Sequence, residues 1–167
     1  MPSTPGLGLP YPPRTGVTPN VARDLEALAV ALDRAVPRGL ISYRRKAAGA
    51  GPATKAKNFL TIAGLSQTVT LRTARTLEVM FTGQFTSGTN GTTIGCQVYN
   101  RTKGTGLVVT ETVEVATRPH QLVNFDVLPL AAGTYTFDVR LVWWGGGGGA
   151  HLTGSPSLFS IKDVGPA

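Results

Sequence analysis

The sequence contains very little cysteine and unusually little charge. Cys96 is the one cysteine among 167 residues, which excludes an intrachain disulfide framework and any metal site built from several cysteines. Charged residues make up 15% of the chain, below the roughly 25% of ordinary soluble domains. The net charge of +7 therefore reflects a shortage of acids. A histone-like or polybasic nucleic-acid protein would carry far more charge than this.

Long apolar runs are also missing. No stretch approaches the ~20 residues that a membrane helix needs, so we expect no membrane partner. The first residues lack the basic and apolar regions of a secretory signal, which leads us to expect a protein made in a reducing compartment. The length suits one domain, and the 21 glycines and 12 prolines favour turns over long helices.

The prolines that are present concentrate at the start of the chain. Six of them lie in residues 1–19, which rules out a helix interior or a central strand there. We expect a Pro-rich extended arm. Its apolar residues Leu7, Leu9 and Tyr11 are regularly spaced and could lie in a groove on a partner. A disordered tail is the alternative.

Residues 20–36 carry the pattern of one short amphipathic helix. Thr18 can cap it and Pro19 can occupy its first position, while Pro37 ends it. A heptad seam runs through Val21, Leu25, Leu28, Leu32 and Ala35. Such a helix is marginal alone, so its apolar face must pack against the chain's own β domain or form a short parallel bundle between subunits. Two heptads do not decide between these. On the second alternative we predict a homotrimer.

Residues 37–57 are expected to form a basic linker. Seven cations and no acid lie between Arg34 and Lys57, so the basicity belongs mainly to this stretch. The linker could contact DNA phosphates or an acidic protein surface, or could be a solvated connector. Without interleaved aromatic residues or a DNA-binding motif, the pattern argues against a nucleic-acid partner.

From residue 58 the pattern changes to strands. Thr134–Trp143 alternates apolar and polar residues, as a half-buried antiparallel strand does. The other expected strands are Asn58–Ala63, Gln67–Arg72, Thr76–Thr82, Thr92–Tyr99, Leu107–Val115, Gln121–Leu128 and Ser157–Val164. About eight strands separated by glycine-rich turns predict a mainly β protein, with an antiparallel β-sandwich of jelly-roll type over residues 58–167.

The sequence offers little catalytic chemistry. His120 and His151 have no metal-ligand companions nearby, and Cys96 lies on the apolar side of an expected strand, where a thiol is inert. Gly145–Gly149 lacks the context of a phosphate-binding loop, and we expect it to be mobile or held by a neighbouring subunit. We therefore expect no enzyme, no cofactor and no metal. A carboxylate pair formed across strands leaves no local spacing, so a hydrolytic domain stays a weak alternative.

Two aromatic residues are candidates for exposed contacts. Trp144 falls outside the inward register of its strand and adjoins the glycine run, and Tyr99 ends another strand. Together with Trp143 they raise the alternative of a glycan-binding β domain.

Three motifs lie at the two ends of the chain: the "LPYP" arm at Leu9–Pro12, the short helix around Ala27–Asp33 and the closing strand with its "DxGP" tail at Leu158–Pro166. In these motifs the chain resembles small virion proteins of actinobacterial tailed phages, commonly labelled minor tail proteins. The resemblance implies a non-enzymatic virion protein, often trimeric, made in the bacterial host cytoplasm. Its partners would be other virion proteins of the tail, baseplate or capsid, with the N-terminus as anchor and the β domain outward. The chain lacks the long shaft of a receptor-binding fibre, which keeps a capsid decoration or head-fibre role as the alternative.

Overall fold

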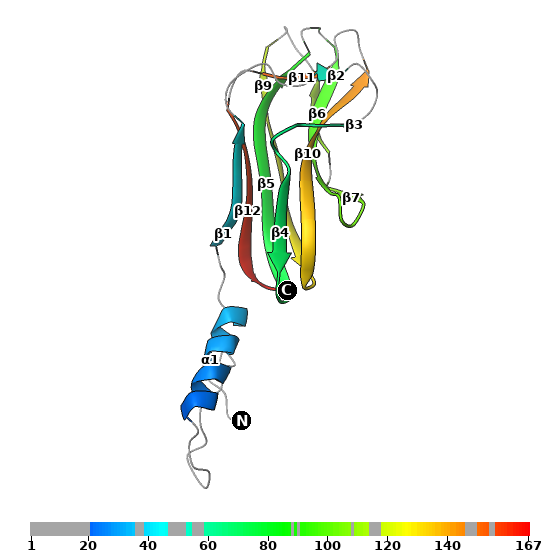
Figure 1. Ribbon diagram of the computed structural model, residues 1–167. Helices are drawn as coiled ribbons and strands as arrows, with labels where there is room; N and C mark the ends of the chain where they lie inside the picture. Colours follow the sequence, from blue (N-terminus) through cyan, green and yellow to red (C-terminus); the bar gives the residue numbers. More distant parts are fainter. Residues whose placement is uncertain are drawn as a thin grey trace.

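The computed structural model shows one helix below a sandwich of two antiparallel sheets (Figure 1). It describes residues 21–35, 39–46, 53–54, 59–87, 89, 91–107, 109–113, 118–145, 150–153 and 156–167. The mainly β class and the sandwich are as predicted. The Pro-rich arm with Leu7, Leu9 and Tyr11, and most of the glycine run, lie outside the described residues.

The first sheet is built around β5 (Arg75–Thr86). β12 (Ser157–Pro166) pairs with one edge of β5, and β9 (His120–Leu130) pairs with the other. β1 (Gly39–Lys46) adds beyond β12, while the short β11 (Ala150–Leu152) pairs with the end of β5 and with β2 (Ala53–Thr54). All of these pairings are antiparallel.

The second sheet is built around β10 (Gly133–Gly145). One edge of β10 carries β4 (Gln67–Leu71) and β3 (Phe59–Thr61), and the other carries β6 (Thr93–Asn100). β6 also pairs with β7 (Thr105–Gly106) and β8 (Thr110–Val113). Eight strands form the main ladder, and the first of them, β1, pairs with the last, β12, while the second, β4, pairs with the seventh, β10; the eight are β1, β4, β5, β6, β8, β9, β10 and β12. The sandwich is therefore a jelly roll.

Strict alternation along the strands creates the core between the sheets. Leu77, Val79 and Phe81 of β5 are fully buried, and Phe137 and Leu141 face them from β10. The alternation predicted for Thr134–Trp143 is confirmed, and each of the eight expected strands overlaps a strand of the structure. Cys96 is also fully buried in this core.

The structure differs from the expected linker over residues 37–57. Gly39–Lys46 forms β1 and Ala53–Thr54 forms β2, so part of this segment belongs to the sandwich. Among the described residues, β1 lies at the edge of its sheet and pairs only with β12. In the sequence, Arg44 and Arg45 suggest a solvated connector. They fit into β1 because an edge strand does not need a continuous apolar face.

The helix α1 (Val21–Ala35) has the predicted position in the sequence, but it does not use the sandwich to cover its seam. It projects below the β strands (Figure 1). Leu25 is 59% exposed and Leu32 is 40% exposed. The alternative in which the seam packs against the chain's own β domain is therefore wrong. Within the described residues, no helix has the length and apolarity that crossing a membrane requires.

Candidate functional site

The outer face of the second sheet brings three aromatic residues and one arginine together. Arg140 points outward because its neighbours Val139 and Leu141 point into the core. In the strand register, β6 supplies Tyr99 opposite Asp138, and β3 supplies Phe59 opposite Val142. These side chains therefore flank Arg140 from both neighbouring strands.

Their contacts form a continuous row across three strands. The guanidinium carbon of Arg140 lies 3.2 Å from the ring centroid of Tyr99 and 5.9 Å from that of Phe59. The rings of Phe59 and Trp144 meet edge to face, with centroids 5.6 Å apart and an interplanar angle of 89°. We call Tyr99, Arg140, Phe59 and Trp144 the aromatic–arginine row.

Trp144 reaches this row by the alternation of β10, which turns Trp143 into the core and Trp144, like Arg140, to the outer face. A bulge adjoins it, since Trp143 pairs with Ile94 and Gly145 pairs with Thr93. Trp144 is 40% exposed and Tyr99 is half-buried, and their role as contact residues stays a prediction. Trp143 is buried, which removes it from the surface that the glycan-binding alternative assumed.

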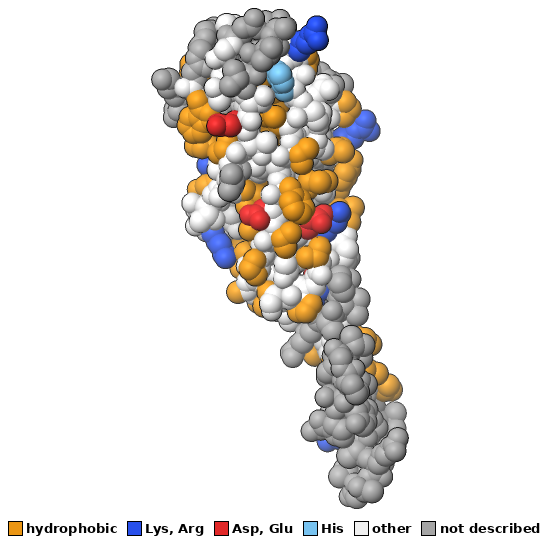
Figure 2. Space-filling model, turned by 180° about the vertical axis from the view of Figure 1, so that it is seen from behind, with side chains coloured by type: hydrophobic (Ala, Val, Ile, Leu, Met, Phe, Trp, Pro, Cys, Tyr) orange, Lys and Arg blue, Asp and Glu red, His pale blue; other side chains and the backbone are white. Residues whose placement is uncertain are grey.

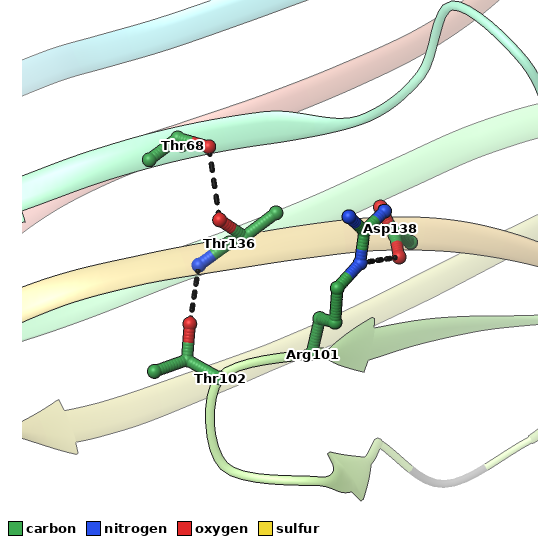
Figure 3. Close-up of polar contacts among 5 residues, drawn as sticks. All are labelled: Thr68, Arg101, Thr102, Thr136 and Asp138. Atoms are coloured by element: carbon green, nitrogen blue, oxygen red, sulfur yellow. Dashed lines mark hydrogen bonds and ion pairs between the residues drawn. The ribbon is translucent and has the colours of Figure 1, made fainter.

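Beside the row, a polar network holds the turn after β6 against β10 (Figure 3). Arg101 donates two hydrogen bonds to the carboxylate of Asp138, from Nε at 2.8 Å and from its terminal nitrogen at 2.7 Å. Thr136 joins the neighbouring segments, since its backbone N–H donates to Thr102 Oγ1 and its hydroxyl is 2.9 Å from that of Thr68. These contacts fix the outer face of the sheet next to Arg140.

The charges on this face are unevenly balanced. Asp138 is almost fully buried and is neutralised by Arg101. Within the described residues, no carboxylate forms an ion pair with Arg140, whose contacts are with the rings of Tyr99 and Phe59. Arg140 therefore presents an uncompensated positive charge beside exposed aromatic rings.

The first sheet carries a different surface, which is apolar. Val123, Phe125 and Val127 of β9 are each close to half exposed and point the same way along the strand, away from the core. We call these three residues the β9 apolar face. Figure 2 shows hydrophobic side chains gathered along this side of the sandwich, with few charges among them. Nearby, Lys162 and Glu78 neutralise each other at 2.7 Å.

The predicted anchoring residues of the helix lie as follows. Leu25 and Leu32 are exposed and Leu28 is half-buried, all on α1. Val21 is the first residue of α1. The exposed part of the seam and the β9 apolar face are thus two apolar surfaces without cover in the single chain.

The groups with catalytic potential do not converge in the described part of the chain. His120 lies opposite Phe85 and His151 opposite Thr86, so they flank adjacent residues of β5 and face opposite sides of the sheet. No group of three potential metal ligands occurs among the described residues. Burial raises the pKa of the Cys96 thiol to about 12, which agrees with the expected inert cysteine.

No protein-family model and no curated protein matches the chain. Among solved structures, that of infectious bursal disease virus Gt strain superposes with a TM-score of 0.50 at 14% identity, over 74% of this chain and 33% of that chain. The Eiger TNF of S. frugiperda gives 0.49 at 12% identity over 78% and 96%. The globular domain of zebrafish complement 1qA gives 0.44 at 8% identity over 79% and 100%. At 14% identity, the likeness to the first of these structures shows the fold alone.

Two members of the row, Phe59 and Arg140, were not predicted as site residues. The alternation of Thr134–Trp143 does place Arg140 on the outer face. Its meeting with Phe59, however, depends on pairing between segments about 80 positions apart, which strand patterns do not reveal.

Proposed function

We propose that this chain is a non-enzymatic virion structural protein that assembles as a homotrimer through α1 and displays its jelly roll outward. The arrangement of an exposed helix at one end and a packed sandwich at the other supports this proposal. The motifs shared with small phage virion proteins support it too, and they favour a tail-associated position. Capsid decoration is the alternative position, and the fold is compatible with both.

The exposed seam of α1 is the observation that carries the proposal. Leu25 and Leu32 lie one above the other in the heptad pattern and remain exposed in the single chain. Burying a leucine side chain stabilises an assembly by about 1.5 to 3 kcal/mol. An isolated helix of 15 residues is marginal in water. A parallel bundle of three such helices would bury the seam and stabilise each helix.

The β9 apolar face gives the proposal a second, independent support. Val123, Phe125 and Val127 place adjacent apolar side chains on one exposed sheet face. Contiguous apolar surface of this kind usually marks a contact with another protein. Side-by-side sandwiches above a three-helix bundle would bring such faces close to neighbouring subunits.

Light scattering of the full chain tests the assembly. We expect a mass three times the 17.5 kDa of one chain at micromolar concentration. Replacing Leu25 and Leu32 together with lysine should shift the protein toward monomer, because three pairs of charges cannot be buried in one bundle.

Val30→Lys provides the matched control. Val30 is 44% exposed on α1 but lies on the side opposite the seam, so this variant should keep the trimer. A wild-type protein that is monomeric at micromolar concentration would refute the homotrimer. If Val30→Lys disrupted the trimer as much as the double change at Leu25 and Leu32, the role of the seam in assembly would be refuted.

The virion role has its own test. A chain lacking residues 1–36 should fold, because the sandwich core lies outside that segment, but it should fail to enter particles. Normal incorporation of this truncated chain would contradict the anchoring role of the N-terminus. Immunogold labelling of particles that carry the full chain would distinguish a tail position from a capsid position.

A further inference from the structure

The aromatic–arginine row differs from scattered surface aromatic residues because each of its members contacts the next one in space. Tyr99, Arg140, Phe59 and Trp144 come from three adjacent strands, and each contacts the next. Phe59 and Trp144 are each 40% exposed. The row thus offers two accessible rings and one cation within a few ångströms of each other.

The row is held rigidly before any ligand arrives. Phe59 and Arg140 lie on paired strands, and Arg140 stacks on Tyr99 at 3.2 Å. A stacked guanidinium keeps its N–H groups at its edge, where they can donate two parallel hydrogen bonds to an anionic group. A side chain that is already ordered loses little conformational entropy on binding.

The positive charge of Arg140 favours a ligand with an anionic group. Asp138, the carboxylate nearest to Arg140 along β10, is buried and fully engaged by Arg101. Glu111 of β8 is exposed on the same face, opposite Gly95 of β6, which itself lies opposite Val142 of β10. It forms no ion pair with Arg140, so the positive charge of Arg140 has no ion-pair partner on the described part of this face.

The exposed rings of Trp144 and Phe59 favour a ligand that also has an apolar face. An aromatic ring has a negative face, which attracts the weakly positive C–H groups on the apolar side of a sugar ring. Trp144 and Phe59 meet edge to face, so they present such surfaces at right angles on one side of Arg140. A sugar ring that carries an anionic group matches both features at once.

We propose that the aromatic–arginine row is a binding site for acidic saccharides, in which a sugar ring packs on Trp144 and Phe59 and its carboxylate pairs with Arg140. This site lies on the outer face of the second sheet, whereas the β9 apolar face lies on the first. Both surfaces can therefore act in the same assembly.

Isothermal titration calorimetry of the full chain tests the site with trigalacturonate, a carboxylated trisaccharide. Its fully methyl-esterified form is the neutral reference, because the two probes share one sugar backbone. We expect trigalacturonate to bind at least tenfold more tightly than the ester. Arg140→Gln should remove that preference, and Trp144→Ala should weaken binding of trigalacturonate at least tenfold.

Tyr43→Ala is the matched control, since it removes an exposed aromatic residue from β1 of the other sheet. It should leave the affinity unchanged, and circular dichroism of each variant should show an intact β fold. The proposal fails if trigalacturonate does not bind at millimolar concentration, or if the ester binds equally well. Binding that persists in Trp144→Ala would also overturn it, because simple attraction of an anion to a chain of net charge +7 would then be sufficient.

Discussion

A buried ion pair joins the two central strands of the first sheet, and its removal should be costly. Arg75 Nε donates to Asp163 Oδ2 at 2.7 Å, and both side chains are at most 2% exposed. Asp163 Oδ1 also accepts a hydrogen bond from the backbone N–H of Gly165 at 3.0 Å. Asp163 therefore holds both the arginine of β5 and the irregular end of β12.

The change Asp163→Asn removes the charge and keeps the size and the Oδ1 acceptor. Arg75 would then be a buried cation facing an amide. Breaking a buried ion pair from one side costs about 3 to 5 kcal/mol, because the remaining charge stays desolvated. For a domain of this size, each kcal/mol lowers the melting temperature by roughly 2 to 4 °C. We therefore expect a decrease of roughly 6 to 20 °C.

The neighbouring pair provides the control, since Lys162 Nζ and Glu78 Oε1 also span β5 and β12 at 2.7 Å. Their side chains are 44% and 23% exposed, so Glu78→Gln should cost about 1 kcal/mol or less. Urea unfolding at one fixed protein concentration would compare the free energies of unfolding. Equal losses in the two variants, or a loss below about 1 kcal/mol for Asp163→Asn, would refute this reasoning.

Two further predictions concern adjacent residues of β6. Because Cys96 is buried with a thiol pKa of about 12, the native protein should resist a thiol reagent at pH 8 and react once urea unfolds it; rapid native reaction would contradict this. Since its folded-state pKa exceeds the ordinary value of 9.0, Cys96 should also contribute to a loss of stability as pH rises from 9 toward 12. Gly95→Ala should lower the free energy of unfolding by about 1 to 3 kcal/mol, because the added Cβ would lie 2.6 Å from the carbonyl oxygen of Thr110. An unchanged melting temperature would show that β8 can move away.

The sandwich was predictable because its strands carry their own signal. Alternation and glycine-rich turns identified the eight expected strands, including the long strands β10 of the second sheet and β12 of the first. The segments that were missed carry no such signal. β1 is eight residues long but mostly exposed on both faces at the edge of its sheet, so it shows no apolar alternation. β2, β7 and β11 are two or three residues long, too short for any period to show. Their pairing follows from the strands around them.

The candidate site was predictable only in part. The sequence indicated Trp144 and Tyr99 separately as exposed contact residues, Trp144 from its register in the strand and Tyr99 from its position at a strand end. Their connection runs through Arg140 and Phe59 and depends on how β3, β10 and β6 align. The hydrophobic pattern fixes which face of each strand is buried, but which residues of strands far apart in the sequence lie opposite each other depends on how the sheet assembles.

The basic stretch between Arg34 and Lys57 now has a structural explanation for part of its charge. Arg44 and Arg45 lie on β1, which has one paired edge and one open edge. The open edge of a strand presents N–H and C=O groups that invite another strand to pair. Charged side chains oppose such pairing, because a second strand would have to desolvate them or bring its own cations alongside. Protection of the strand edge therefore explains the positions of these two arginines without an acidic partner. If the basic stretch has a role in attachment, its other cations must provide it.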